Sequence, residues 1–248
     1  MRPIWDLCFN ILMWTVFAVS VVPLFFVALA IRILTAPFDP NRRVLQRFSC
    51  LWASFYIWVN PFWQIRVKGL EHVDRRKVYV MISNHQSMAD ILVVYRTLLH
   101  FKWVSKDILF KTPFLGWNMI LNGYVPIKRG DAESRKQCMQ ACRAWLDKGS
   151  SVFFFPEGTR SETGAMRPFK LGAFQLALDS GVDILPMVIR GSREALPKHS
   201  ALIHTHSDME IEVLPPIAVR RSDSQEAAVA LADETRTAIA KAVKPQLS

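Results

Sequence analysis

Three short apolar segments, each followed by polar residues, constrain the fold of this chain more than any other feature. Residues 78–82, 151–155 and 183–189 are rich in β-branched and aromatic side chains, and their one charged residue is Asp183. Such runs are typical of strands that are buried on both faces of a sheet. Residues 208–213 instead alternate between charged and apolar side chains, which predicts a half-buried strand. We therefore expect an α/β fold, a mixed sheet flanked by helices.

Helical segments separate these strands. Residues 132–148 form the clearest predicted helix, because Asp131 is suited to cap its amino terminus and Gly149 to end it. The remaining expected elements are helices at 88–99 and 170–180, strands at 101–105 and 123–127, and a last helix opened by a capping box at 223–226.

A histidine and an aspartate follow the first apolar strand. His85 falls in the turn after residues 78–82, and Asp90 falls in the first turn of the next helix. A carboxylate on one ring nitrogen fixes the imidazole tautomer and leaves the other nitrogen free to accept a proton. From this spacing alone, two interpretations stay open: a general base with its orienting partner, or a surface histidine beside a helix-start aspartate.

A second polar cluster follows residues 151–155. The turn after Pro156 lies at the carboxyl end of a strand, where α/β sheets usually bind ligands, and it consists of Glu157, Gly158, Thr159 and Arg160. Arg160 offers a planar fork suited to phosphate oxygens. Lys106, Lys128 and Arg129 follow other predicted strands and are expected at the same edge. A single such cation is commonly a solvated surface charge, but four at strand ends predict an anion site.

Taken together, the chain contains four ordered blocks: Asn84-His85-x4-Asp90, the segment that ends in Arg129, Phe155-Pro156-Glu157-Gly158-Thr159-Arg160, and the strand with Leu185-Pro186. These blocks resemble those of the glycerolipid acyltransferase family, and most of all its 1-acylglycerol-3-phosphate (lysophosphatidate) acyltransferases. The resemblance covers about residues 64–217. It implies transfer of a fatty acyl group from acyl-CoA or acyl-carrier protein to lysophosphatidic acid, giving phosphatidic acid in phospholipid biosynthesis.

The resemblance also implies roles for individual residues. His85 is the expected base and Asp90 its partner, and Lys106 is a weaker candidate for substrate binding. The residues expected to bind or frame the phosphate-bearing acceptor are Arg129, Glu157, Gly158, Thr159 and Arg160. Lys128 departs from the family pattern, which often has an acidic residue before the arginine. The alternatives are therefore an acyltransferase for another lysophospholipid or lipid acceptor, or a non-catalytic membrane module that binds anionic lipid.

The chemistry expected from the residues needs no cofactor. The sequence has no Gly-x-Ser-x-Gly elbow, Walker A loop or Gly-x-Gly-x-x-Gly fingerprint, so a serine acyl-enzyme and a nucleotide fold are unsupported. We expect the acceptor hydroxyl to attack the thioester directly, with oxyanion donors among backbone N–H groups near His85 or Gly158. His204 and His206 share a strand face without a third ligand nearby, so no metal site is predicted.

Charge and hydropathy indicate a membrane partner. The net charge of +10 accompanies 51% hydrophobic residues, which favours an anionic bilayer surface over nucleic acid. Residues 7–31 are uncharged and long enough as a helix to cross a bilayer. Arginines are more frequent after this segment than before it, which predicts a catalytic domain on the cytoplasmic face.

The next segment, residues 48–65, is uncharged and rich in aromatic residues. This composition favours a helix in the membrane interface, with a core helix of the catalytic domain as the alternative. We therefore expect residues 1–65 to form membrane-anchoring helices, one anchor and one interfacial. Residues 66–248 are the expected acyltransferase catalytic domain.

Overall fold

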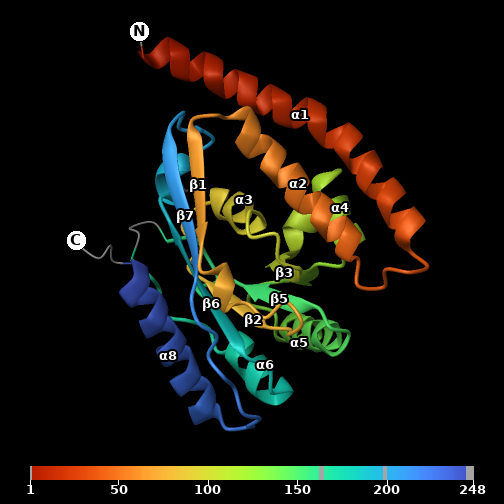
Figure 1. Ribbon diagram of the computed structural model, residues 1–248, viewed down its shortest axis with the longest axis vertical. Coiled ribbons are helices and arrows are strands. Elements are labelled where there is room, and N and C mark those ends of the chain that lie inside the picture. The colour runs from red at the N-terminus through yellow and green to blue at the C-terminus, as the bar shows by residue number, and fades with distance from the viewer. Residues whose placement is uncertain (1, 162–164, 198–199, 244–248) are drawn as a thin grey trace.

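A seven-stranded sheet runs through the centre of the computed structural model, which describes residues 2–161, 165–197 and 200–243 (Figure 1). The strand order is β1-β7-β6-β2-β5-β3-β4. The strands are β1 (Trp63–Lys68), β2 (Val80–Ser83), β3 (Phe101–Lys106), β4 (Val125–Ile127), β5 (Ser151–Phe154), β6 (Ile184–Arg190) and β7 (Ser207–Val213).

Helices surround this sheet. They are α1 (Arg2–Thr35), α2 (Arg43–Val59), α3 (Ala89–Tyr95), α4 (Leu115–Asn122), α5 (Ala132–Asp147), α6 (Gly172–Ser180), α7 (Ser192–Ala195) and α8 (Gln225–Val243). Two short 3-10 helices, η1 (Leu70–His72) and η2 (Asp107–Lys111), complete the described elements.

The pairing of the strands confirms a mixed sheet. β2 runs parallel to both β5 and β6, and β3 runs parallel to β4 and β5. β7 is antiparallel to β6 and parallel to β1. Because β2, β5, β3 and β4 share one direction, their carboxyl ends meet at the same edge of the sheet.

Helices cover both faces of the sheet, which explains the uninterrupted apolar runs in the sequence. Figure 1 shows α5, α6 and α8 on one side and α2 and α3 on the other. Alternate side chains of β2 enter separate cores, Val80 and Ile82 on the first side and Met81 on the second. All side chains of β2 and β5 are buried, as expected for central strands.

Most predicted helices are confirmed, with corrections at their ends. Asp131 caps α5, and its Oδ1 accepts from Ser134 N at 3.0 Å. The helix expected at 88–99 is shorter, because α3 ends at Tyr95 and the chain then turns through Leu98, whose φ is +54°. The predicted capping box was wrong in register: Ser224 rather than Asp223 caps α8, and its hydroxyl accepts from Ala227 N.

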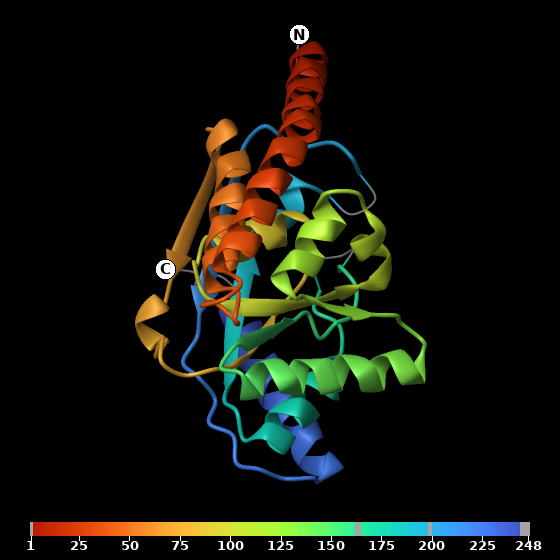
Figure 2. The same ribbon diagram turned by 90° about the vertical axis from the view of Figure 1, so that its right-hand side faces the viewer.

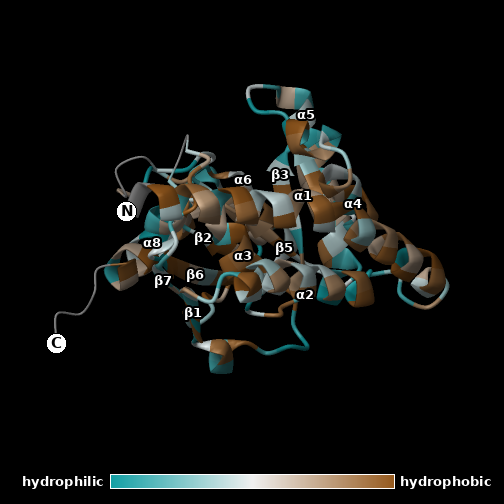
Figure 3. Cartoon of the chain, turned by 90° about the horizontal axis from the view of Figure 1, so that it is seen from above, coloured by the Kyte–Doolittle hydropathy of each residue, from teal (hydrophilic) through white to brown (hydrophobic). Residues whose placement is uncertain are grey.

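The N-terminal region consists of two long helices. α1 is one continuous helix with Pro23 inside it, and by length and composition it could cross a membrane. A third apolar cluster joins α1 to α2, with Val21, Phe25 and Ala28 packed against Leu45 and Trp52. Seen from above, α1, α2 and α4 carry many hydrophobic residues (Figure 3).

The predicted boundary after residue 65 falls inside a strand. Trp63, Gln64 and Ile65 do not continue the interfacial segment but pair with residues 207–209 of β7 as the first half of β1. In addition, α2 contributes Cys50 and Ala53 to the core that covers the sheet. The segment expected only at the membrane interface therefore also packs on the sheet domain, because its helix is amphipathic and one face is buried.

Candidate active site

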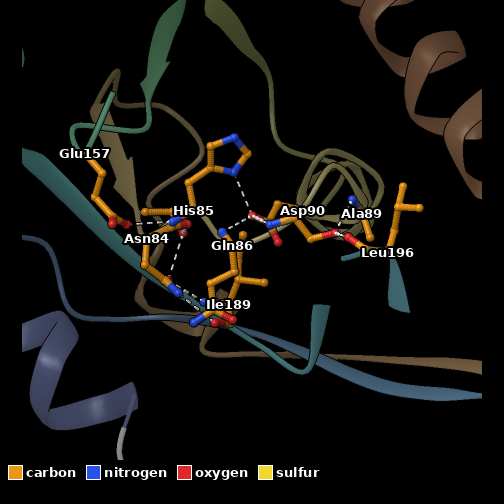
Figure 4. Close-up of polar contacts among 10 residues, drawn as sticks. Asn84, His85, Gln86, Ala89, Asp90, Glu157, Ile189 and Leu196 are labelled. Carbon is orange, nitrogen blue, oxygen red and sulfur yellow. Dashed lines mark hydrogen bonds and ion pairs between the residues drawn. The ribbon is translucent and has the colours of Figure 1, made fainter. Parts of the chain in front are cut away.

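The His85 side chain is held by Asp90 at the point where β2 gives way to α3 (Figure 4). The distance between His85 Nδ1 and Asp90 Oδ2 is 2.7 Å, and the Asp90 side chain is fully buried. The same Oδ2 accepts backbone N–H bonds from Gln86 at 2.7 Å and Ser87 at 3.0 Å. An anionic acceptor at Nδ1 selects the tautomer with its proton there, so Nε2 is left as a proton acceptor. The sequence expectation of paired side chains is met in geometry.

Aromatic stacking fixes the plane of the His85 ring. The ring centroids of His85 and Phe155 lie 3.9 Å apart with a 13° angle between planes, and Phe155 stacks in turn on Trp103. The His85 side chain keeps 13% of its surface exposed. The imidazole is therefore clamped between a carboxylate and an aromatic face, with a limited opening toward solvent.

Two polar residues that the sequence left without a role hold the turn in place. The Asn84 side-chain amide donates to Ile189 O and accepts from Ile189 N, both at 2.9 Å, so it extends the pairing of β2 with β6 past the strand end. Ser87 Oγ donates to Leu196 O at 2.6 Å and accepts from Ala89 N at 3.0 Å. Both residues are small, polar and buried beside His85. Their structural role could not be predicted, because burial cannot be read from the sequence.

Glu157 braces the His85 turn from the neighbouring strand. Its Oε1 accepts from His85 N at 2.9 Å, and its Oε2 accepts from Arg167 N at 3.0 Å. The residue is 4% exposed, and this burial raises the pKa of its carboxyl group. Both carboxylate oxygens are occupied by backbone donors. Glu157 therefore holds the backbone of the His85 turn in place, and its expected role toward the acceptor stays a prediction.

The rest of the Glu157 turn lies close to the His85 segment. Ser161 N donates to His85 O at 2.9 Å, so the chain on either side of Thr159 and Arg160 is tied to the His85 turn. Gly158 has a φ of +71°, and a Cβ atom there would lie 2.8 Å from Lys170 Cε. A residue with a side chain at 158 would therefore strain the backbone, and the end of the Lys170 side chain would have to move.

The strand order places the predicted cations at increasing distances from His85. Arg160 follows β5, which is next to β2, whereas Lys106 ends β3 and Arg129 follows β4. Because neighbouring strands lie about 4.8 Å apart, the end of β3 is roughly 10 Å from that of β2 and the end of β4 roughly 14 Å. Arg160 is thus the predicted cation nearest to the imidazole.

None of the side chains of Lys106, Arg129 and Arg160 has a hydrogen bond or ion pair with another residue in the described ranges. Lys128 differs, since its Nζ lies 3.5 Å from Asp131 Oδ2. The lysine that departs from the family pattern is therefore paired with the acidic cap of α5. Among the described residues, no cluster of His, Cys, Asp and Glu could hold a metal ion.

Comparison with known proteins gives consistent matches. A family model described as Acyltransferase matches residues 64–190. The chloroplastic 1-acyl-sn-glycerol-3-phosphate acyltransferase LPAT1 of Arabidopsis thaliana is 40% identical over 210 residues, which are 83% of this chain and 56% of that protein. A 1-acyl-sn-glycerol-3-phosphate acyltransferase of Chlamydomonas reinhardtii is 36% identical over 229 residues, 91% of this chain and 66% of that protein. The chain thus spans less than two thirds of the length of these relatives.

The fold also matches a solved structure. The crystal structure of the 1-acyl-sn-glycerophosphate (LPA) acyltransferase PlsC from Thermotoga maritima superposes with a TM-score of 0.79 at 19% identity, and the match covers 100% of both chains. This likeness supports the fold, with its mixed sheet and N-terminal helices. Because the family model matches just over half of the sequence, the chain belongs to the acyltransferase family.

Proposed function

We propose that this protein transfers a fatty acyl group from an acyl thioester to the free hydroxyl of lysophosphatidic acid, giving phosphatidic acid. The observation that carries the proposal is the 2.7 Å contact between His85 Nδ1 and Asp90 Oδ2 at the sheet edge that also presents Arg160. Membership of the acyltransferase family and the names of the similar proteins support the same reaction.

The geometry supports a direct transfer. The acceptor hydroxyl attacks the thioester carbonyl carbon while His85 Nε2 takes the hydroxyl proton, and a new C–O bond forms. The tetrahedral intermediate then collapses, the C–S bond breaks, and the leaving thiolate takes the proton from the imidazolium. Asp90 lowers the energy of the imidazolium that exists between these two steps. Besides the acceptor, these steps require only the acyl thioester, carried by coenzyme A or acyl-carrier protein.

Contacts inside the turn restrict where the oxyanion can be stabilised. The backbone N–H groups of His85, Gln86 and Ser87 already donate to Glu157 or Asp90. The Gly158 N–H donates to Phe155 O at 3.0 Å, so the donors expected first are committed elsewhere. The N–H groups of Thr159 and Arg160 have no backbone or side-chain acceptor among the described residues, and we assign the oxyanion to them.

We assign binding of the acceptor phosphate to the cationic side chains on the same edge of the sheet. Arg160 is adjacent to the His85 strand and presents two parallel N–H groups, which suit a phosphate monoester. Arg129, two strands farther along the edge, completes the clamp from the other side, with Lys106 between them. This arrangement holds the acceptor hydroxyl on the His85 side and its phosphate toward β4.

The polar contacts of α1 favour a position in one leaflet. Asn10 exchanges two hydrogen bonds with Ile203, and Trp14 Nε1 donates to Ala201 O at 2.9 Å. A helix that crossed the bilayer would carry these residues away from the catalytic domain. We therefore propose that α1 lies along the domain, with its exposed apolar side in the cytoplasmic leaflet where the acceptor resides.

The activity is tested by offering the purified protein a panel of lysophospholipids with acyl-CoA and with acyl-carrier protein as donors, and identifying products by mass. The expected product is phosphatidic acid from lysophosphatidic acid, formed at least roughly 10²-fold more slowly by the His85→Ala variant. Preferential acylation of another lysolipid would reassign the acceptor. Binding of lysophosphatidic acid without product from either donor would instead support the non-catalytic lipid-binding module.

A further inference from the structure

A recess lies at the opposite edge of the sheet from His85. It has a volume of about 270 Å³ and includes Tyr79 and Ser151, which stand at the amino ends of β2 and β5. Its walls come from α2, from the turn before β2, and from the connection between α3 and β3. These segments play no part in the reaction proposed above. Figure 2 shows the turn before β2 (light orange) on the left, whereas the carboxyl ends of β3 and β5 point to the right.

The mouth of this recess is strongly basic. Arg43 and Arg47 reach it from α2, and Arg75 and Lys77 reach it from the turn before β2. The carboxylate among its lining residues is that of Asp74, whose Oδ1 already accepts from Arg76 N at 2.9 Å. Lys77 is already paired, since its Nζ lies 3.4 Å from Asp183 Oδ2, and Arg43 donates to Gly149 O at 3.0 Å. Arg47 and Arg75 have no ion pair among the described residues, so cationic groups from two separate segments still converge on one opening.

Two buried side-chain nitrogens without a partner among the described residues belong to lining residues of the same recess. Gln46 is 2% exposed and its Oε1 accepts from the Tyr124 hydroxyl at 2.7 Å, but its Nε2 has no partner among the described residues. His100 Nε2 pairs with Ser150 Oγ at 2.9 Å, whereas its Nδ1 also lacks a partner there. A buried amide N–H is normally satisfied, and a vacant one in a recess lined by cations is suited to an anion with several acceptor oxygens. His100 adds a second donor in the tautomer that carries its proton on Nδ1.

We propose that this recess is a second, non-catalytic anion site that binds a phosphate group. Arginine forks and tetrahedral phosphate oxygens fit one another, and the amide of Gln46 can donate to the oxygen that enters most deeply. Met81 and Leu99 add apolar surface beside the cations, so the phosphate can be that of a lipid headgroup or a free phosphate ion. The bound anion joins α2 to the turn before β2.

The test uses the full chain in detergent micelles with its histidines labelled with ¹⁵N. His100 is identified by the signal that His100→Gln removes, which separates this recess from anion binding near Arg160. Inorganic phosphate, a short-chain phosphatidic acid and an uncharged short-chain diacylglycerol are titrated in turn. The expected result is a saturable shift of the His100 signal with at least one phosphate-bearing probe and none with the diacylglycerol.

Neighbouring arginines supply a matched pair of variants. Arg75→Ala removes a lining residue and should raise the half-saturating concentration roughly tenfold. Arg76→Ala removes an exposed arginine that does not line the recess and should change it less than about twofold. Gln46→Glu, which keeps the acceptor for Tyr124, should weaken binding like Arg75→Ala.

Saturation by inorganic phosphate assigns the site to a free phosphate, and saturation by short-chain phosphatidic acid alone assigns it to a lipid headgroup. A His100 signal that stays fixed with both probes overturns the proposal. Equal weakening by Arg75→Ala and Arg76→Ala also overturns it, because the effect then belongs to general surface charge.

Discussion

The turn around His85 and the helix α1 differ in how far their side chains and backbone groups are satisfied by contacts within the protein. In the turn, the backbone N–H groups of residues 85–87 all donate to buried carboxylates, and the imidazole is stacked on Phe155. Along α1, large apolar side chains such as Leu12 and Phe26 are more than half exposed. The polar groups of the turn find their hydrogen-bond partners within the protein, whereas the apolar surface of α1 is left uncovered by the rest of the chain. We therefore expect the residues of the turn to serve the proposed reaction, and the exposed residues of α1 to serve membrane binding.

The largest effect should follow from removing the base. His85→Ala should cut turnover by roughly 10² to 10⁴ and leave acceptor binding nearly unchanged, because the phosphate clamp is untouched. Steady-state turnover and direct binding of lysophosphatidic acid measure the two quantities. Asp90→Asn should lose less, since the ring remains but its orientation degrades. A folded His85→Ala protein with near-normal turnover would remove His85 from the mechanism.

The phosphate clamp should respond more weakly and more selectively. Arg160→Lys should raise the acceptor KM roughly tenfold and change the donor KM little, because an ammonium group cannot reproduce a two-pronged contact. Lys106→Arg, a change of cation two strands from β2, serves as the comparison and should have a smaller effect. An equal rise of both KM values in Arg160→Lys would place Arg160 at the donor site or in the fold.

Charged residues introduced on the exposed side of α1 should weaken membrane binding without changing the catalytic reaction. The double variant Leu12→Glu/Phe26→Glu should lower the vesicle-bound fraction severalfold, since both side chains are exposed and their apolar area anchors the helix. Turnover on a monomeric short-chain acceptor should stay within about twofold. Val229→Glu, at an exposed apolar position of α8, is the control and should leave both quantities alone. Loss of activity on the monomeric acceptor as well would mean that α1 shapes the active site.

A buried lysine on β3, bonded to the loop that follows α1, should affect stability rather than activity. Lys102 is fully buried, and its Nζ donates to Asn41 O at 2.8 Å and Asn122 O at 2.9 Å. Burial, and then the charge of Arg42, lower the pKa of Lys102 from 10.5 to about 7. Between these values the unfolded chain binds more protons, so the contribution of Lys102 to stability should increase as pH rises from 7 toward 10.5.

Thermal unfolding of the wild type and Lys102→Met at pH 7 and pH 9 checks this sign. The wild type should gain stability relative to the variant at pH 9, by an amount on the order of 1.4 kcal/mol for each pKa unit crossed. The Nζ atoms of Lys102 and Lys148 both lie over the Trp145 ring, at 4.6 and 5.2 Å from its centroid. Lys148 is exposed, so Lys148→Met is the matched control. A parallel pH response of wild type and Lys102→Met would show that Lys102 is not charged differently in the folded and unfolded chains.

Local patterns predicted much of the fold and part of the site. The central strands were recognisable because strands covered on both faces must be apolar throughout. The His85 and Asp90 pair was accessible because a turn and the first turn of a helix bring both side chains together within five residues. β1 was missed, since Trp63–Lys68 becomes a strand only by pairing with β7, far along the chain.

What the sequence by itself determined is the local chemistry: apolar strands, a histidine beside a carboxylate, a turn with a cation, and an uncharged helix. The tertiary structure decided which of these groups act together. Glu157 reaches the backbone of His85, Asn84 pairs with Ile189, and Asn10 fastens α1 to Ile203. Each of these contacts joins residues at least 72 positions apart. Their partners are chosen by strand order and packing, which no local periodicity encodes.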